Sequence, residues 1–567
     1  MIRVMSRLAV VLAVMVASVL AAQTPDPAAD RFTVVEAGIA DLRTAMEQGR
    51  TTSREIVRQY LERIATYEDR LNAAITINPR ALAEADERDR ERRLGKIRGP
   101  LHGIPVALKD NIHTTDMATT GGALAFERLV PPYEATLTAN LRRAGAIVIA
   151  KTVLTELANF IAEGMPTNYS SLASFAFNPY DPRRDPRAAG FDGRPVLATG
   201  GSSSGIGTAA SFWAANVGTE TSGSILNPAS QTMLVGIKPT VGRISRYGVI
   251  PITADQDTPG PMARTVADAA EMLGVLESAS PDPADPATRA CPAPQDRDYT
   301  RFLRANALTG ARIGIPRAFY YDRVPSAGAA GMSGGINDAR RAVMDEAIAV
   351  LAKAGATIVD PADIPSVVAT SPAGNLLRWP ICNGAAGARG RDENCSIVFK
   401  YGMKRDFNAW LASLGPAAPV TSLTELRAWN RAHEGGGTLK YGQTQLDISD
   451  DIDLERDRAR YLADREKDLQ LAGREGIDAA LGAHQLDALL FPGPTGAALA
   501  ARPGYPSVIV PFGMVPNDGD APFPAGFNPR PIPYGVTFTG PACSEPRLIE
   551  LAYAFEQRTK RRRPPDL

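Results

Sequence analysis

The chain has 567 residues, of which 44% are hydrophobic and 22% charged, enough apolar material for one large globular core. Its 62 basic residues balance its 62 acidic residues, which argues against nucleic acid or an anionic membrane as the main partner. It has four histidines and four cysteines, and neither an HExxH nor a CxxC motif, so we expect no metal site and no cofactor.

The N-terminus has the three-part pattern of a secretory signal peptide. Arg3 and Arg7 precede an apolar run that ends near Leu20, and two alanines follow it. The run is short for a transmembrane span of roughly 20 residues, although an uncleaved N-terminal anchor is the alternative. We therefore predict a signal peptide over residues 1–22 and an exported protein, periplasmic or secreted, without a stable membrane span.

Export would allow the cysteines to form disulfides. Cys382 and Cys395 lie close together in the sequence and flank a loop rich in glycine and arginine. They are the favoured bridge, although the spacing alone does not fix how Cys291 and Cys543 pair.

Helix and strand signals alternate in the first part of the chain. Apolar residues recur at helical spacing after a capping box, and short apolar runs mark strands. This rhythm predicts an α/β fold built on a sheet. In chain order, the elements are a helix that begins at the Thr52–Glu55 box, a charged helix over 81–94, a strand over 104–108, a helix over 136–144 and a strand over 146–150.

The later part of the chain adds connectors and a mostly helical region. We expect one large domain over residues 23–567 with lid-like insertions and a more variable segment over about 278–485. The predicted elements are proline-rich connectors over 178–195 and 278–295, a helix capped by Thr265, a strand–helix–strand unit over 313–360, helices over 421–485, strands over 489–492 and 507–511, and a basic stretch over 558–563 interpreted as a solvated helix end.

Serine and glycine gather in two short clusters, Gly200–Gly205 and Thr221–Ser224. A serine hydroxyl can act as a nucleophile, and glycine lets backbone N–H groups approach a reacting carbonyl. Two such clusters in one segment predict acyl-transfer chemistry built from serines and main-chain donors.

A serine nucleophile needs a base, and the first 430 residues offer only His102 and His113, neither of them in a cluster. Lys109 follows the predicted strand over 104–108, at a sheet edge where sites gather. Burial could lower its pKa enough to make it a neutral base. The alternative is a surface lysine paired with Asp110.

Four motifs occur in order over residues 104–251, namely GIPVALKDNI, TGGSSSG, GTETSGSI and GIKPTVGRISRYGVIP. Together with LNAAITIN upstream and with DQDTPGPMARTVADAA and PGYPSVIVPFG downstream, they resemble the amidase signature family of Ser–cis-Ser–Lys hydrolases. The branch that looks most similar is that of bacterial peptide amidases. The resemblance implies a single amidase-signature domain with a mixed β-sheet covered by helices on both faces and a signature core over about 100–275.

The resemblance also implies the roles of individual residues. The reaction would cleave a carboxamide, such as a C-terminal peptide amide, to an acid and ammonia or an amine through an acyl-enzyme. Carried over by motif, Lys109 is the base, Ser202 the bridging serine in a cis peptide, Ser224 the nucleophile, and the backbone N–H groups of Thr221, Ser222 and Gly223 part of the oxyanion hole.

Two departures from the family pattern stand out. Ser202 and Ser224 are 22 residues apart, about two fewer than is usual in the family. Two residues would rotate a continuous helix by about 200°, so we expect a turn within 209–217 to absorb the difference. Otherwise Ser203 or Ser204 could take the role of Ser202. Ser222 stands where many members have glycine.

Three alternatives stay open. GSSSG also matches GxSxG centred on Ser203, which would make an α/β-hydrolase esterase with His433 or His484 as base and a strand over 196–199. An amidotransferase A-type subunit would pass ammonia to a partner, which the predicted signal peptide opposes. A non-enzymatic glycine/serine loop could bind an anion at a helix N-terminus.

Overall fold

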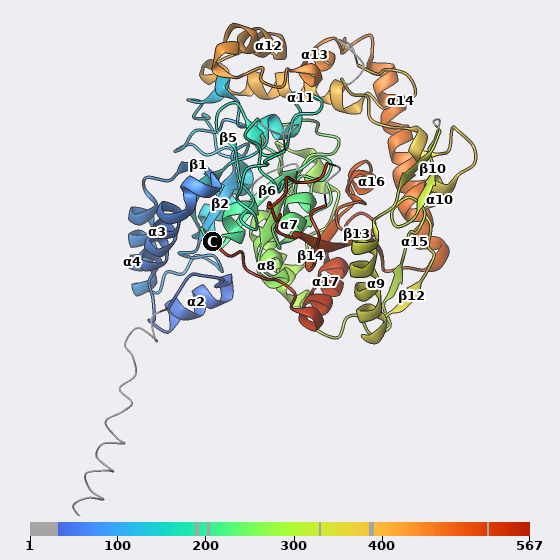
Figure 1. The fold of residues 1–567 in the computed structure, drawn as a ribbon. Helices are drawn as coiled ribbons and strands as arrows, with labels where there is room; N and C mark the ends of the chain where they lie inside the picture. Colours follow the sequence, from blue (N-terminus) through green and yellow to red (C-terminus); the bar gives the residue numbers. More distant parts are fainter. Residues whose placement is uncertain (1–31, 188–191, 201–204, 328–329, 385–389, 519–520) are drawn as a thin grey trace, which may run out of the picture.

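The computed structural model describes residues 32–187, 192–200, 205–327, 330–384, 390–518 and 521–567. An eleven-stranded sheet runs through this part of the chain in the order β1-β3-β2-β6-β8-β7-β14-β15-β13-β9-β12 (Figure 1). No helix of the described residues is both long and apolar enough to cross a membrane. The predicted signal peptide lies outside the described residues and stays a prediction.

The strands of the large sheet are short, and most of them are buried along their whole length. Their bounds are β1 Ala74–Ile77, β2 Pro105–Lys109, β3 Ile147–Thr152, β6 Ala215–Glu220, β7 Val235–Lys238, β8 Thr258–Ala263, β9 Arg312–Gly314, β12 Thr357–Val359, β13 Ala488–Pro492, β14 Ser507–Val515 and β15 Ile532–Thr539. Two small hairpins are β4 Tyr169–Ser170 with β5 Ser174–Phe175, and β10 Arg323–Pro325 with β11 Met332–Gly334.

The helices are distributed along the whole described chain. Those of the first half are α2 Ile39–Glu47, α3 Ser53–Leu71, α4 Ala81–Arg93, α5 Thr136–Arg143, α6 Gly205–Ala209, α7 Leu226–Gln231 and α8 Val266–Leu276. Those of the second half are α9 Asp338–Lys353, α10 Pro365–Val368, α11 Val398–Ser413, α12 Leu423–Ala432, α13 Thr444–Asp450, α14 Arg458–Asp468, α15 Asp478–His484, α16 Ala497–Ala501 and α17 Glu545–Thr559.

The sheet is mixed, as predicted. β2 pairs in parallel with both β3 and β6, and β9 pairs in parallel with β12 and β13, whereas the other neighbours are antiparallel. The first six strands in the order come from residues 74–263 and the other five from residues 312–539. The two halves meet where β7 pairs with β14.

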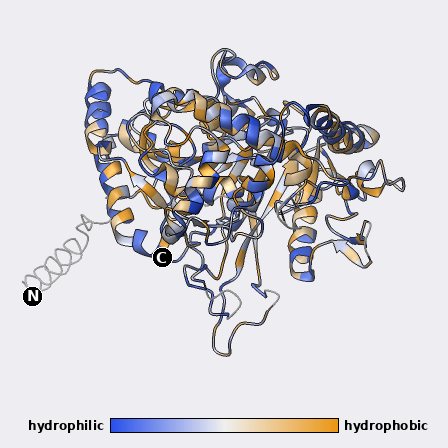
Figure 2. Ribbon diagram, turned by 90° about the horizontal axis from the view of Figure 1, so that it is seen from above, coloured by the Kyte–Doolittle hydropathy of each residue, from blue (hydrophilic) through white to orange (hydrophobic). Residues whose placement is uncertain are grey.

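Helices cover both faces of the sheet, which confirms the predicted architecture. Along β14, Val508 and Val510 belong to the same apolar cluster as Phe555 of α17. The intervening Ile509 belongs instead to a cluster with Leu226 of α7. Because successive side chains of a strand point to opposite faces, α17 and α7 lie on opposite sides. Figure 2 shows hydrophobic colours along the inner elements and hydrophilic ones on peripheral helices and loops.

Most long elements lie where the sequence predicts them. The Thr52 hydroxyl accepts a hydrogen bond from the backbone N–H of Glu55 (3.1 Å) at the start of α3, and Thr265 caps α8 in the same way. Residues 421–485 are largely helical, and Figure 1 shows α11 to α14 as a layer beyond the sheet. The Cys382–Cys395 disulfide is confirmed, and Cys291 pairs with Cys543.

A turn over residues 210–214 joins α6 to β6, within the segment 209–217 where the sequence predicts one. The Trp213 indole Nε1 donates a hydrogen bond to Thr208 Oγ1 (2.8 Å), so its ring folds back onto α6. The ring takes the space above Gly207, where a Cβ would lie 2.0 Å from it. The expectation of a turn at this place is therefore confirmed.

Candidate active site

Lys109 ends β2, and its side chain is fully buried against β6, the parallel neighbour of β2. Its Nζ donates hydrogen bonds to the carbonyl oxygen (3.2 Å) and to Oγ1 (2.8 Å) of Thr219. Burial lowers the pKa of Lys109 to about 7, against the opposing effect of the Asp257 and Glu220 carboxylates. A large neutral fraction of this amine is therefore available near pH 7.

The alternative of a surface lysine paired with Asp110 is wrong. The Asp110 carboxylate lies 3.0 Å from Nζ of Lys151, a second buried lysine on β3. It also accepts a hydrogen bond from the backbone N–H of Thr120 (3.0 Å). Asp110 and Lys109 thus have separate surroundings although they are neighbours in the sequence.

The contacts of Lys109 also orient its lone pair. A neutral amine has two N–H bonds and one lone pair, and the two acceptors on Thr219 account for both N–H bonds. The Asn111 side-chain amide donates to the same Thr219 Oγ1 (3.0 Å), which fixes the hydroxyl in place. When neutral, Lys109 therefore presents its lone pair away from Thr219, in a fixed direction.

The loop after β6 carries the predicted nucleophile. Oε2 of the buried Glu220 accepts hydrogen bonds from the backbone N–H groups of Ile225 (2.7 Å) and Leu226 (2.9 Å). Gly223 has φ +112°, a conformation that glycine adopts without strain. Ser222 has no positive φ, so a serine fits where many members of the family have glycine. Ser224 ends this loop with 9% of its surface exposed.

Asp257 supports the same loop from the neighbouring segment. The Thr221 hydroxyl donates to Oδ1 of Asp257, and the backbone N–H groups of Ile252 (2.8 Å) and Thr253 (2.9 Å) donate to Oδ2. Burial raises the pKa of Asp257 to about 7. The sequence analysis assigns no role to Asp257 or Glu220, and only their places within the motifs DQDTPGPMARTVADAA and GTETSGSI could have indicated one.

A cavity of about 380 Å³ opens beside this loop. One wall is the loop over residues 221–224, and Phe160 and Phe399 also line the cavity, with their rings edge-on at 5.8 Å. Asn159 also lines it, within a run of three left-handed residues over 157–159. Such strained backbone concentrates at functional sites. The remaining lining residues are Ala158, Thr167, Ala198, Gly200, Asn227, Gln231 and Ile252.

Ser202, Ser203 and Ser204 lie outside the described residues, so their predicted roles stay predictions. The residues on either side of them both approach α7 or the turn after it. At Gly200, which also lines the cavity, a Cβ would lie 2.6 Å from the Cβ of Asn227. At Gly205, a Cβ would lie 2.6 Å from Oγ1 of Thr232. The described ends of the serine cluster are therefore held close to the helix that follows Ser224.

The features that an α/β-hydrolase interpretation needs are missing from the described residues around this cavity. Residues 196–199 form no strand ahead of the GSSSG motif. His433 is exposed at the end of α12 and stacks on Trp429 (3.8 Å between ring centroids), and His484 ends α15. Neither histidine lines the cavity. No histidine is therefore among the described residues that line the cavity, and the role of Ser203 stays a prediction.

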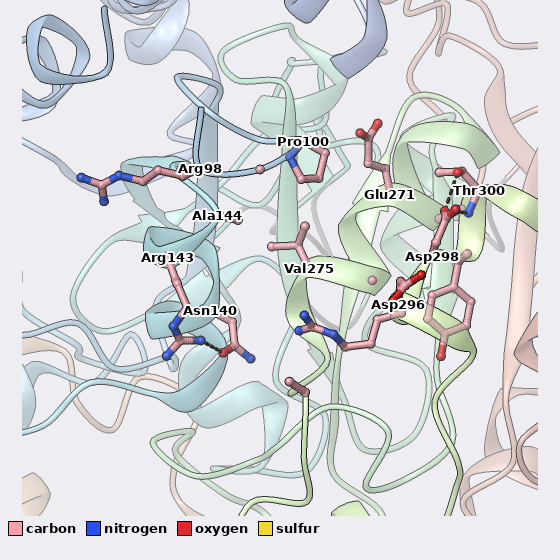
Figure 3. Close-up of a pocket in the computed structure, with 16 residues that line it drawn as sticks. Arg98, Pro100, Asn140, Arg143, Ala144, Glu271, Val275, Asp296, Asp298 and Thr300 are labelled. Atoms are coloured by element: carbon pink, nitrogen blue, oxygen red, sulfur yellow. Dashed lines mark hydrogen bonds between the residues drawn. The ribbon is translucent and has the colours of Figure 1, made fainter. Parts of the chain in front are cut away.

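A larger cavity of about 610 Å³ lies elsewhere, between α5, α8 and residues 296–300 (Figure 3). Its side chains are engaged with one another: Arg143 donates to Asn140 Oδ1 (2.6 Å), and Asp298 accepts from the backbone N–H of Thr300 (2.9 Å). None of the predicted site residues lines it. Nor do three or more His, Cys, Asp or Glu side chains gather as a metal site anywhere in the described part of the chain.

Known proteins resemble this chain along most of its length. The amidase family model matches residues 55–549. A probable amidase from Arabidopsis thaliana is 33% identical over 94% of this chain and 92% of its own length. The A-type subunit of a glutamyl-tRNA(Gln) amidotransferase from Thermosynechococcus vestitus is 31% identical over 92% of this chain and 98% of its own.

The peptide amidase of Stenotrophomonas maltophilia is a similar solved structure. It has a TM-score of 0.76 and 38% identity over 94% of this chain and 98% of its own. The chain therefore belongs to the amidase family and is a hydrolase that acts on amide C–N bonds.

Proposed function

We propose that the protein is an exported hydrolase of linear carboxamides, in particular C-terminal peptide amides, and that it works through an acyl-enzyme on Ser224 with a proton relay through Ser202 to Lys109. The observation that carries the proposal is the buried Lys109 amine. Its pKa is lowered to about 7, and its two N–H bonds are taken up by Thr219. Such a group suits general-base catalysis near neutral pH.

The relay accounts for every proton. Neutral Lys109 accepts a proton from Ser202, which accepts one from Ser224 as the Ser224 oxygen attacks the amide carbon. The same proton then passes back to the leaving nitrogen, which departs as ammonia or an amine. Water attacks the acyl-enzyme by the same route, and the acid is released with Ser224 restored.

The loop over 221–224 would bind the negative oxygen of the tetrahedral intermediate. The loop lines the cavity, and Glu220 and Asp257 hold it from behind through their hydrogen bonds with Ile225, Leu226 and Thr221. Because these contacts exist before substrate binds, the donors need little reorganisation during the reaction. Each such donor is worth about 2.7–4 kcal/mol in comparable sites.

The cavity supports a peptide-like acyl group. Phe160, Ile252 and Phe399 offer an apolar surface for a side chain. Asn159 Oδ1 is buried and has no hydrogen-bond partner among the described residues, so it can accept a bond from a backbone N–H of the substrate. The likeness to a peptide amidase over 94% of this chain supports the same class of substrate.

Export rests on the signal-peptide pattern over residues 1–22. Two disulfides among the described residues, Cys291–Cys543 and Cys382–Cys395, support an oxidising compartment. Cell fractionation followed by mass measurement tests this proposal. A chain cleaved near residue 22 in the periplasm or the medium is the expected result, and an uncleaved chain in the cytosol is the contrary one.

Ammonia release from peptide amides, aliphatic amides and anilides tests the activity. We expect Ser224→Ala to abolish turnover, whereas the matched Ser222→Ala variant keeps its backbone donor and most of its activity. Wild-type turnover by pure Ser224→Ala protein would refute the acyl-enzyme.

The role of Asn159 can be tested separately. Asn159→Ala should lower kcat/KM for peptide amides by about 2–12-fold, the worth of one neutral hydrogen bond. It should leave unchanged the turnover of an aliphatic amide, which has no backbone N–H to donate. An equal effect on both substrates would contradict the assignment.

The amidotransferase relatives suggest one other function, since their A-type subunits match most of this chain. An enzyme of that kind would pass ammonia to a partner. Steady release of free ammonia by the purified chain alone supports the hydrolase, and turnover only with a partner would support the alternative.

A further inference from the structure

The segment after α17 returns across the molecule toward the N-terminal elements (Figure 1). The basic stretch there is predicted to be a solvated helix end, but Arg562 is only 14% exposed in its side chain. Its guanidinium forms a two-pronged pair with the carboxylate of Glu36, with Nε and Nη2 each 2.8 Å from an oxygen. It is therefore a fixed structural group.

The same guanidinium reaches two backbone carbonyls. Nη2 donates to the carbonyl oxygen of Ala209, the last residue of α6 (3.4 Å), and Nη1 donates to that of Met233, just beyond α7. Arg562 thus joins the C-terminal ends of α6 and α7, the two short helices that follow the predicted catalytic serines.

The backbone carbonyls at the C-terminal end of α6 accept hydrogen bonds from several arginines. Arg264 donates to the carbonyl oxygen of Thr208 (2.9 Å), and Arg63 donates to those of Ala210 (2.7 Å) and Ser211 (2.9 Å). The last carbonyls of a helix have no partner within it and carry partial negative charge, so cations at that end stabilise it. Of these arginines, Arg562 is the one that also contacts the turn after α7.

We infer that Arg562 is a positioning residue for catalysis, which holds α6 and α7 at a fixed separation and so keeps Gly205, at the start of α6, and Ser224, just before α7, in fixed relative positions. The inference rests on the proposed function. α6 begins at Gly205, three residues after Ser202, and α7 begins at Leu226, two residues after Ser224. Both helices are short, so a shift at their far ends moves the loops before them.

The expected effect is on the rate of the chemical step. A displacement of about 1 Å between reacting groups can lower a rate 10²-fold. We expect Arg562→Gln to lower kcat per active site by roughly 10–100-fold by this displacement. Arg562→Lys keeps the positive charge but lacks the planar guanidinium that binds several acceptors at once. Its kcat should therefore lie between those of the wild type and Arg562→Gln.

The matched control is Arg561→Gln. Arg561 is the neighbouring arginine and pairs with Glu346 on the exposed surface, away from α6 and α7. It should keep wild-type kcat. Glu36→Gln removes the carboxylate partner of Arg562 and should reproduce part of the Arg562→Gln defect.

The experiment measures kcat on a peptide amide per active site, counted by titration with a serine-directed fluorophosphonate, together with the rate constant of that labelling. A fall in both at Arg562, with a full count of sites, supports the inference. A kcat per titrated site within twofold of wild type in Arg562→Lys and Arg562→Gln overturns it, even if their melting temperatures drop. Activity in Ser224→Ala would instead refute the proposed function, and the inference with it.

Discussion

The pH dependence of the reaction tests the proposed base directly. With a pKa of about 7 for Lys109, about one tenth of the amine is neutral at pH 6 and about nine tenths at pH 8. We therefore expect kcat/KM on an uncharged peptide amide to rise about tenfold over this interval. A lysine at the ordinary value of 10.5 would be less than about 1% neutral at pH 8 and would give no plateau.

Asp257 titrates in the same range, because burial raises its pKa to about 7 as well. Its carboxylate raises the pKa of Lys109, so the two groups titrate as a coupled pair whose apparent pKa values belong to both. Asp257→Asn removes the negative charge and can keep its contacts, with the amide oxygen accepting from Ile252 and Thr253 and the amide nitrogen donating to Thr221. In this variant we expect the rise in kcat/KM to move to lower pH.

The assay is ammonia release between pH 5.5 and 9 at constant ionic strength, with recovery of full activity at pH 7 checked at each end. Lys109→Arg stays charged throughout and should be inactive across the range. A flat profile between pH 6 and 8 would refute a titrating Lys109. A rise at the same pH in wild type and Asp257→Asn would show that another group controls the rate.

Three further predictions concern the support of the site and the fold. Thr219→Val removes the hydroxyl that Lys109 and Asn111 share, and should lower kcat by up to about tenfold, the worth of one neutral hydrogen bond, in the same ammonia assay. Gly207→Ala would place a Cβ 2.0 Å from the Trp213 ring and should destabilise the protein by about 1–3 kcal/mol, measured as a lower melting temperature. Burial lowers the pKa of His113 to about 3, so the folded state binds fewer protons than the unfolded state below pH 6.5, and stability falls as the pH drops. Protonation of His113 should lower the free energy of unfolding of the wild type by about 2 kcal/mol between pH 7 and pH 5. His113→Gln should therefore show a smaller drop in melting temperature over that interval.

Each of these has a clear contrary outcome. A Thr219→Val enzyme with unchanged kcat would mean that the backbone carbonyl alone orients the amine. A Gly207→Ala protein as stable as wild type would mean that the turn over 210–214 yields easily. Equal pH dependence of melting in His113→Gln and wild type would assign acid sensitivity to other groups.

The outer elements of the fold were predictable because their signals are local. Thr52 and Thr265 mark helix starts by capping, and β2 is an apolar run that ends in a polar residue. The neighbouring strands β6, β8 and β7 were not predicted in this way. β8 carries Pro259 and Pro261 between β6 and β7, where proline argues against a strand, and its pairing depends on long-range contacts.

The candidate site shows the same contrast between local and long-range signals. Lys109 could be predicted from its place at the end of a strand and Ser224 from its motif, because each of these signals lies within a few residues of sequence. The partners of the loop were not, since Asp257 meets Thr221 across 36 residues of chain, and Arg562 meets Ala209 across 353. Neither contact leaves a pattern in the sequence, because an Asp or Arg that the fold buries has the same sequence signal as one that stays on the surface.

The Cys291–Cys543 disulfide would hold the protein together after proteolytic cleavage of the chain. It closes a loop with a sequence separation of 252, which contains β9 to β15 and the helices α9 to α16. A protease cut anywhere inside that loop leaves two fragments that are still covalently joined. The fragment with Lys109 and Ser224 then keeps α17 and Arg562 beside it at the effective concentration of a tether, whatever the dilution. Reduction is needed as well as cleavage before the two pieces can diffuse apart.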